Sequence, residues 1–169
     1  MIQDILRDFI LYNGADKMVG RIESFKPPDL ERLVEDVRMS GMDMPMPVDM
    51  GMAAMEASWV TTGIDAGSYA GFGLISSATP IAVSVRGAVI NPLTGIPTPV
   101  IHAFNGPITK IEAAAWKVGE RPGLTTTIKP IFYSLTHGGV PVIEIDVING
   151  IRLVGGVDQL ITLRAITGR

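Results

Sequence analysis

The chain has 169 residues, of which 47% are hydrophobic and 18% are charged, with no cysteine and a formal net charge of -3 at pH 7. This length predicts a single domain over residues 1–169, and the absence of cysteine excludes a disulfide framework and a thiolate metal site. No window gathers Lys and Arg, which argues against tight nucleic-acid binding, and the start Met-Ile-Gln-Asp does not resemble a secretory signal.

The first predicted element is a β-hairpin. Residues 8–12 and 17–25 lie on either side of Asn13-Gly14, a pair that tolerates the positive φ of a tight turn. A pair of prolines follows the second strand and ends it.

The next segment, residues 29–38, carries apolar residues at helical spacing. They follow Asp29, a residue type that favours the N-cap of a helix, so this pattern alone predicts a short amphipathic helix. The residues that define the spacing are Leu30, Leu33, Val34 and Val37.

From residue 42 to residue 52 the apolar period changes to two, which predicts an extended chain. One face holds Met42, Met44, Met46, Val48, Met50 and Met52, and the other holds Asp43, Pro45, Pro47 and Asp49. After Ala53-Ala54 the apolar residues shift to odd positions, at Met55, Ala57 and Trp59. We therefore expect a bulge or bend at Ala53-Ala54.

Two interpretations of the methionine-rich segment 42–46 are open. Thioether sulfurs bind copper(I), but no Cys or His lies nearby to complete such a site. Methionine is also the adaptable residue of surfaces that repack against a partner. We favour the contact surface.

The middle of the chain is poor in charge. Between Asp65 and Glu112 the only charged residues are Arg86 and Lys110, and the stretch is too long to be wholly interior, so part of it is expected to meet another subunit. The uncharged run 66–85 contains several Gly, Ser and Thr residues and a proline, which argues against a membrane span. We interpret its glycines, Gly67, Gly71 and Gly73, as packing or turn residues.

The second half of the chain reads as a series of short strands separated by Gly and Pro. An alternating strand over 81–89 is expected to pair with 100–104, and three further strands are expected over 108–116, 124–135 and 140–148. A short helix is predicted over 157–166. Many short strands with few helices indicate a mainly β fold, an antiparallel sandwich or barrel of two packed sheets.

Candidate catalytic groups are few. Glu144 and Asp146 are two apart on a predicted strand, so they share a face and could in principle act as acid and base. The simpler interpretation is the polar side of a half-exposed strand. The two histidines, His102 and His137, have no serine nucleophile motif to serve, and ordinary strand and turn positions explain them.

Two blocks of the sequence contain motifs of a recognisable order and spacing. The first block contains Gly41-Met42, Pro47-Val48-Asp49-Met50-Gly51 and Met55-Glu56-Ala57-Ser58-Trp59. The second contains Ile143-Glu144-Ile145-Asp146-Val147-Ile148-Asn149, Gly156-Val157-Asp158-Gln159-Leu160 and Arg164. Together they resemble the long-hairpin region and the C-terminal signature of the major tail tube protein family of contractile-tailed bacteriophages, with a weaker likeness over 8–20 and 125–135.

The resemblance implies a fold of two packed antiparallel sheets with a flanking short helix and a long β-hairpin. It implies a strand, not a helix, over 29–38. It also implies a structural protein of the virion tail, assembled in the host cytoplasm, that builds stacked hexameric rings with a continuous lumen wall and conducts DNA during ejection. Such a protein is not an enzyme and has no cofactor, no metal and no membrane partner.

The partners implied by the resemblance are further copies of the chain and the tail sheath, tape measure, baseplate and tail terminator proteins, with DNA only transiently in the lumen. The predicted inter-subunit contact consists of Met42, Met44, Met46, Pro47, Val48, Asp49 and Met50. Two other classes stay open: a small-ligand or metal-binding β-barrel, and a hydrolase that uses Glu144 and Asp146.

Overall fold

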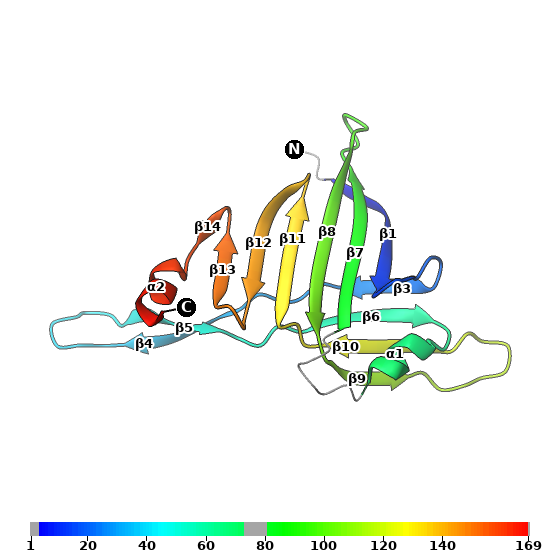
Figure 1. The fold of residues 1–169 in the computed structure, drawn as a ribbon, viewed down its shortest axis with the longest axis horizontal. Coiled ribbons are helices and arrows are strands. Elements are labelled where there is room, and N and C mark those ends of the chain that lie inside the picture. Colours follow the sequence, from blue (N-terminus) through cyan, green and yellow to red (C-terminus); the bar gives the residue numbers. More distant parts are fainter. Residues whose placement is uncertain (1–3, 73–80, 169) are drawn as a thin grey trace.

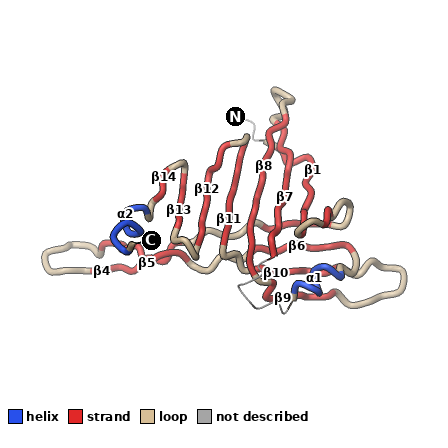
Figure 2. The backbone as a smooth tube through the Cα atoms, viewed as in Figure 1, coloured by secondary structure: helices blue, strands red, loops and turns tan. Residues whose placement is uncertain are grey.

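In a computed structural model, which describes residues 4–72 and 81–168, the chain consists mainly of strands arranged in two packed antiparallel sheets and a projecting hairpin (Figure 1). Figure 2 shows how little of the backbone is helical. The predicted mainly β class, with two sheets, a short helix and a long hairpin, is confirmed.

The larger sheet has eight strands. They are β1 (Ile5–Asn13), β2 (Asp16–Lys17), β7 (Ile81–Ile90), β8 (Pro97–Gly106), β11 (Phe132–His137), β12 (Val140–Asp146), β13 (Ile151–Val154) and β14 (Val157–Asp158). Their order is β14-β13-β12-β11-β8-β7-β1-β2. The predicted pairing of 81–89 with 100–104 is confirmed, because β7 and β8 form an unbroken antiparallel ladder. In β7 the alternation buries Val83 and Val85 and leaves Ser84 and Arg86 on the opposite face.

The smaller sheet has four strands: β3 (Ile22–Lys26), β6 (Ala57–Thr62), β9 (Ile108–Ala113) and β10 (Gly123–Ile128). Their order is β3-β6-β10-β9, so β3 and β9 are the edges. Figure 1 shows that these strands cross those of the larger sheet at a steep angle. Ala57, Trp59 and Thr61 alternate along β6 and are buried between the sheets.

The hairpin consists of β4 (Arg32–Val37) and β5 (Met46–Met52) and pairs with neither sheet. The strand that the family resemblance implied within 29–38 is confirmed, and the helix that the local spacing predicted is wrong. The spacing misleads because Leu30, Leu33 and Val34 are all exposed, so they do not form the buried face of a helix.

The core lies between the sheets. Trp59 of the smaller sheet and Leu11 and Phe104 of the larger sheet are at most 2% exposed. Phe25 stacks on Phe104 with ring centroids 5.8 Å apart and so links the two sheets. Burial of a large apolar side chain of this kind stabilises a fold by about 2–3 kcal/mol, so these residues fix how the sheets pack.

Helix α1 (Ala66–Gly71) lies beside β9 and was not predicted. Asp65 caps it, because its carboxylate accepts hydrogen bonds from the Ser68 backbone N–H at 2.9 Å and the Ser68 hydroxyl at 2.6 Å. The interpretation of Gly71 as a packing residue is confirmed, since a Cβ there would lie 2.3 Å from Ile81 Cδ1. Gly73 is outside the described residues.

Two predicted strands change sheet partway along the sequence. The turn at Asn13-Gly14 is present, but the second strand of that hairpin ends at Lys17, and residues 22–26 join the other sheet as β3. The predicted strand 124–135 divides at Pro130, which has no N–H for a ladder, into β10 and β11. Alternation alone does not reveal which sheet a strand joins.

Two boundaries, at the hairpin tip and at the C-terminal helix, differ from the prediction, and the predicted bend between them is present. Residues 42–45 belong to the tip of the hairpin and are not part of a strand, whereas 46–52 are extended as expected. The bend at Ala53-Ala54 is confirmed as the loop 53–56, where the chain passes from the hairpin to the smaller sheet. The predicted helix 157–166 begins later, as α2 (Ile161–Thr167), after β14. No helix within 4–72 and 81–168 is long and apolar enough to cross a membrane.

Candidate subunit interface

The β4–β5 hairpin exposes a large number of apolar side chains. It follows β3 and leads into β6, and Figure 1 shows it projecting beyond both sheets at one end of the long axis. Its exposed large apolar side chains are Leu33, Val34, Met39, Met44, Met46 and Met50. Exposure of this many apolar side chains to water is unfavourable for a monomer. The hairpin therefore has the composition of a surface that a partner covers.

The structure brings the seven predicted contact residues together on this hairpin. Met42 and Met44 lie in its tip, and Met46, Pro47, Val48, Asp49 and Met50 lie in β5. Met42 and Val48 are half-buried against their own chain, and the other five are exposed.

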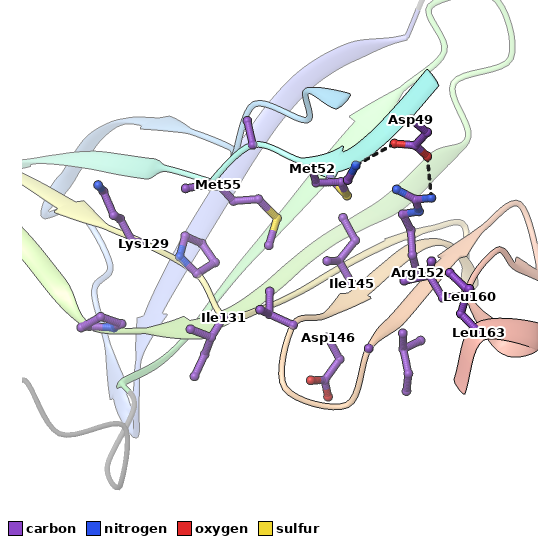
Figure 3. A pocket seen from close by; sticks show the side chains of 18 residues that line it. Asp49, Met52, Met55, Lys129, Ile131, Ile145, Asp146, Arg152, Leu160 and Leu163 are labelled. Atoms are coloured by element: carbon purple, nitrogen blue, oxygen red, sulfur yellow. Dashed lines mark hydrogen bonds and ion pairs between the residues drawn. The ribbon is translucent and has the colours of Figure 1, made fainter. Parts of the chain in front are cut away.

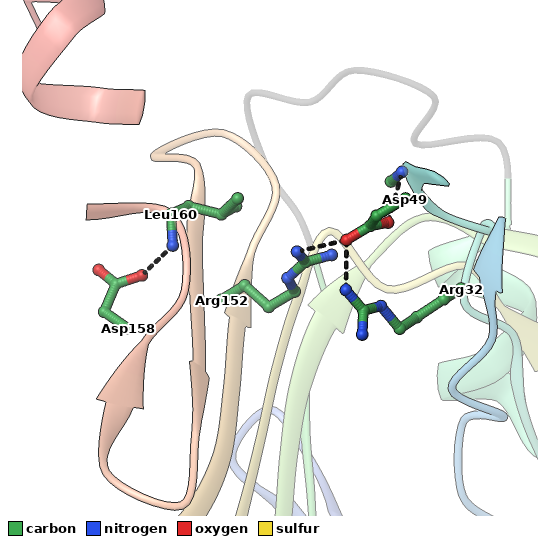
Figure 4. Close-up of polar contacts among 6 residues, drawn as sticks. Arg32, Asp49, Arg152, Asp158 and Leu160 are labelled. Carbon is green, nitrogen blue, oxygen red and sulfur yellow. Dashed lines mark hydrogen bonds and ion pairs between the residues drawn. The ribbon is translucent and has the colours of Figure 1, made fainter. Parts of the chain in front are cut away.

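The root of the hairpin is held by ion pairs around Asp49 (Figure 4). Its Oδ2 accepts hydrogen bonds from Arg32 in β4 and, at 3.0 Å, from Arg152 Nη2 in β13. Its Oδ1 accepts the Gly51 backbone N–H at 2.9 Å. The hydrogen bonds from Arg32, Gly51 and Arg152 hold the pKa of Asp49 well below its usual range, so this carboxylate is charged at neutral pH.

The C-terminal helix is fixed by a second ion pair. Arg164 Nη2 lies 2.6 Å from Asp158 Oδ2, and Arg164 Nη1 donates to the Gly150 carbonyl at 3.2 Å. The hydrogen bond from the Leu160 backbone N–H lowers the pKa of Asp158, and the hydrogen bond from Arg164 lowers it further. These contacts hold α2 beside β13 and β14 while Ile161, Leu163 and Ile166 remain exposed.

A largely apolar cavity of about 660 Å³ opens between the hairpin root and α2. Figure 3 shows Met52 and Met55 on one side of it and Ile145, Leu160 and Leu163 on the other. Asp49 and Arg152 also line it, and Figure 3 shows the two side chains near one another. The cavity therefore lies where three separate parts of the chain meet, beside the exposed hairpin.

Sequence reasoning missed a second exposed feature, the β9–β10 loop. Within it Trp116 is 74% exposed and Val118 is fully exposed. The sequence did contain Trp116, but as the last apolar residue of the predicted strand 108–116, where it was expected to be part of a sheet. The strand ends at Ala113, so this side chain belongs to the loop.

The candidate catalytic pair is part of the framework. Asp146 ends β12 and accepts hydrogen bonds from the Asn149 backbone N–H at 2.9 Å and from the Asn149 side chain at 2.7 Å. Burial acts to raise the pKa of Asp146, but hydrogen bonds from the backbone and side chain of Asn149 and from the backbone of Ile148 lower it. Glu144 lies on the same strand, between Ser134 and Leu153 of its neighbours. Asp146 therefore shapes the β12–β13 turn.

His102 is also a structural residue. Its Nδ1 lies 3.0 Å from the Tyr133 hydroxyl, and its ring packs edge-on against Phe25 at 5.6 Å. Burial lowers the pKa of His102 and raises the pKa of Tyr133 to about 12. No group of three or more His, Asp and Glu side chains within 4–72 and 81–168 could hold a metal ion.

Comparison with known proteins identifies the family. The model of the family described as phage tail tube protein FII matches residues 3–168. The tail tube protein of Escherichia phage P2 is 27% identical over 143 residues, which cover 83% of each chain.

Two solved structures share the fold at low identity. A sheath–tube complex of an extracellular contractile injection system, PVC, matches with a TM-score of 0.57 and 9% identity, covering 76% of this chain and 87% of that one. The sheath/tube terminator of the same system matches with a TM-score of 0.56 and 8% identity, covering 76% and 92%. The family match spans nearly the whole sequence, and the chain therefore belongs to the phage tail tube protein FII family, as a structural component of the virion tail and not an enzyme.

Proposed function

We propose that residues 1–169 act as one tail tube domain that forms hexameric rings, and that these rings stack into the inner tube of a contractile tail through which DNA is ejected. The observation that carries this proposal is the smaller sheet, whose two edge strands among residues 4–72 and 81–168 are β3 and β9. On its outer side β9 has a single bridge there, from Ile108 to Phe72, so most of this edge can pair with another copy. Exposed edges favour uncontrolled pairing, and closure into a ring removes them.

Ring closure follows if β3 of one copy pairs with β9 of the next. Six copies would contribute about 24 strands, and at a spacing of about 4.8 Å between strands the closed wall would be about 37 Å across. The interface would be heterologous, since one edge meets the other, and a heterologous contact closes when the rotation per subunit fits the ring.

The outward face of the smaller sheet suits the wall of a lumen. On the side opposite Trp59, the strands carry hydroxyl side chains beside a few apolar and charged ones. The hydroxyl side chains are Ser24, Ser58, Thr62, Thr125 and the buried Thr127, and the others are Val60, Lys26, Lys110 and Glu112. The lysines near this face are neutralised, because Lys26 pairs with Asp29 at 2.7 Å and Lys110 pairs with Glu112 at 2.9 Å. A wall without free positive charge would bind phosphates weakly and let DNA pass.

Stacking of rings is assigned to the hairpin. Because it continues the line of β3 and β6, it projects along the strands of the smaller sheet, while the edges of that sheet face sideways. We propose that the hairpin contacts a copy in the neighbouring ring through Met42, Met44, Met46, Pro47, Val48, Asp49 and Met50. Deleting residues 42–46 should abolish tubes and leave a folded monomer; tubes at normal yield would exclude this role.

Further partners follow from the family and from the neighbours in fold. The similar structures come from a sheath–tube complex and a sheath/tube terminator, and by analogy we propose a tail sheath and a tail terminator as partners. The tape measure and baseplate proteins complete the set, and DNA would occupy the lumen only transiently.

The proposal is tested by size-exclusion chromatography with light scattering over a concentration series. We expect rings or longer polymers whose mass rises with concentration. A small-ligand barrel would remain a monomer at every concentration and would melt at a higher temperature with its ligand. A strictly monomeric chain would contradict the proposal.

A further inference from the structure

The β9–β10 loop, residues 114–122, presents apolar side chains on an ordered backbone. The Ala114 N–H donates to the Gly123 carbonyl at 2.9 Å, and the Glu120 N–H donates to the Lys117 carbonyl at 3.2 Å. Trp116 and Val118 nevertheless point away from the chain, with exposures of 74% and 108%. An exposed tryptophan on a fixed loop is the kind of side chain that anchors protein–protein contacts.

The loop and the hairpin tip lie at opposite ends of the molecule. Figures 1 and 2 show the β4–β5 hairpin reaching out at one end of the long axis and the β9–β10 loop reaching out at the other. Both project roughly along the strands of the smaller sheet. A second copy displaced along those strands would therefore bring its hairpin tip to the loop of the first.

The chemistry of the two ends is complementary. The outer end of the hairpin exposes Met39 and Met44 by 60% and 72% and Met46, the first residue of β5, by 48%. A thioether packs favourably against an aromatic ring such as that of Trp116. The charges also match when the adjoining ends of β4 and β5 are included with the tip: residues 35–46 contain three acids, two of them in β4, and one base, while residues 114–122 contain two bases and one acid. Opposite net charges favour this pairing over contacts between like ends.

We propose that the β9–β10 loop is the receptor for the hairpin tip of a second copy in the next ring, with Trp116 and Val118 covered by the tip methionines. The proposal rests on the proposed stacking and names the partner surface for it. If a different protein, such as a sheath subunit, covers this loop, Trp116 stays open to solvent in a tube made of this chain alone.

Cross-linking tests which surfaces meet, and the chain has no native cysteine to interfere. A double variant, Met44→Cys with Val118→Cys, is assembled and treated with a short bis-maleimide. We expect a ladder of covalent oligomers in denaturing gels, because each copy links to the copies above and below. The matched control is Met44→Cys with Leu93→Cys, since Leu93 is 73% exposed on the β7–β8 loop; it should give no ladder.

Intrinsic fluorescence is a second readout that needs no cysteine. The chain has two tryptophans, and Trp59 is already fully buried, so the acrylamide-sensitive emission of the monomer comes from Trp116. Assembly should blue-shift this emission and protect it from acrylamide, and Trp116→Phe should remove the change.

The outcomes separate this inference from the proposed function. Tubes that form normally while the Met44–Val118 pair gives no ladder, or while Trp116 stays open to acrylamide, would overturn the loop as receptor and leave the tube intact. Protection of Trp116 only after a sheath protein is added would also overturn it, in favour of that partner. Failure of the unmodified chain to form rings or tubes would contradict both proposals.

Discussion

Asp49 and Arg152 are 103 residues apart in the sequence, and their side chains form a 3.0 Å ion pair that joins the root of the hairpin to β13. The Arg152 side chain is only 12% exposed. The same aspartate also binds Arg32 within the hairpin. One carboxylate thus connects the projecting hairpin to the larger sheet and sets the direction in which the hairpin leaves the molecule.

Replacement of Asp49 by Asn should loosen the hairpin without unfolding the chain. Arg152 would then carry an unpaired charge in a largely desolvated position, and an unpaired charge there destabilises the contact between the hairpin and β13. We expect faster amide exchange in β4 and β5, little change in β7 and β8, and a clear fall in tube yield. Asp43→Asn, at the exposed hairpin tip, is the matched control. Equal exchange in the two variants would show that the ion pair does not hold the hairpin.

The pair His102 and Tyr133 predicts how the stability of the monomer depends on pH. Burial lowers the pKa of His102, so the unfolded chain binds more protons near its ordinary pKa, and stability should fall as pH drops through about 6.5 and below. Burial raises the pKa of Tyr133 to about 12, so stability should also fall as pH rises above about 10. Urea unfolding across pH measures both slopes.

His102→Asn should flatten the acid slope and Tyr133→Phe the alkaline slope. The acid slope is measured against a background from the carboxylates, which lose their ion pairs at lower pH. If the free energy of unfolding keeps the same pH dependence in both variants, folding does not shift the pKa of either group.

Two adjacent residues of β7 separate the stability of the subunit from assembly. Val89 lines a small apolar cavity of about 230 Å³ together with Phe25 and His102, so Val89→Asp should destabilise the monomer by about 2 kcal/mol or more. Ala88 faces the other side and pairs with Asp8. Ala88→Lys places a positive charge opposite that acid, so the free energy of unfolding of the monomer should change by less than about 1 kcal/mol.

If the outward face of β7 is covered in the tube, Ala88→Lys should reduce tube yield although the monomer remains folded. Urea unfolding and light scattering on the same samples give the two quantities. Normal assembly of Ala88→Lys would place this face in solvent.

Sodium chloride should not dissolve the polymer. The charge-poor stretch between Asp65 and Glu112 includes β7 and β8, two inner strands of the larger sheet. Apolar contacts are little affected by screening, and sulfate strengthens them. We expect light scattering to stay level or rise from low to high salt. A steady loss of polymer mass with salt would show that ion pairs hold the rings.

The sequence predicts most strands of this fold because each has a face toward the core. Alternation locates β7 through Val83 and Val85, and the shift in period before Trp59 locates the passage from the hairpin to the smaller sheet. Such local patterns report burial within the chain. They do not report which sheet a strand joins, so the reassignment of 22–26 and the division at Pro130 required tertiary structure.

The candidate interface is less visible in the sequence for a related physical reason. Leu33 and Val34 are spaced as in a helix but lie exposed on a strand, and their apolar character is unexplained by the core of one subunit. The resemblance to a known family, not the periodicity, identified this strand. The contacts of Asp49 with Arg152 and the exposure of Trp116 depend on distant segments, so no local pattern could reveal them.

Electron cryo-microscopy of the purified chain, at a concentration where light scattering detects polymer, tests the central claim most directly. The account predicts stacked rings with six-fold symmetry, an inner wall about 37 Å across formed by the smaller sheet, and hairpins crossing from each ring to the next. Particles without a lumen, or rings lined by the larger sheet, would contradict it.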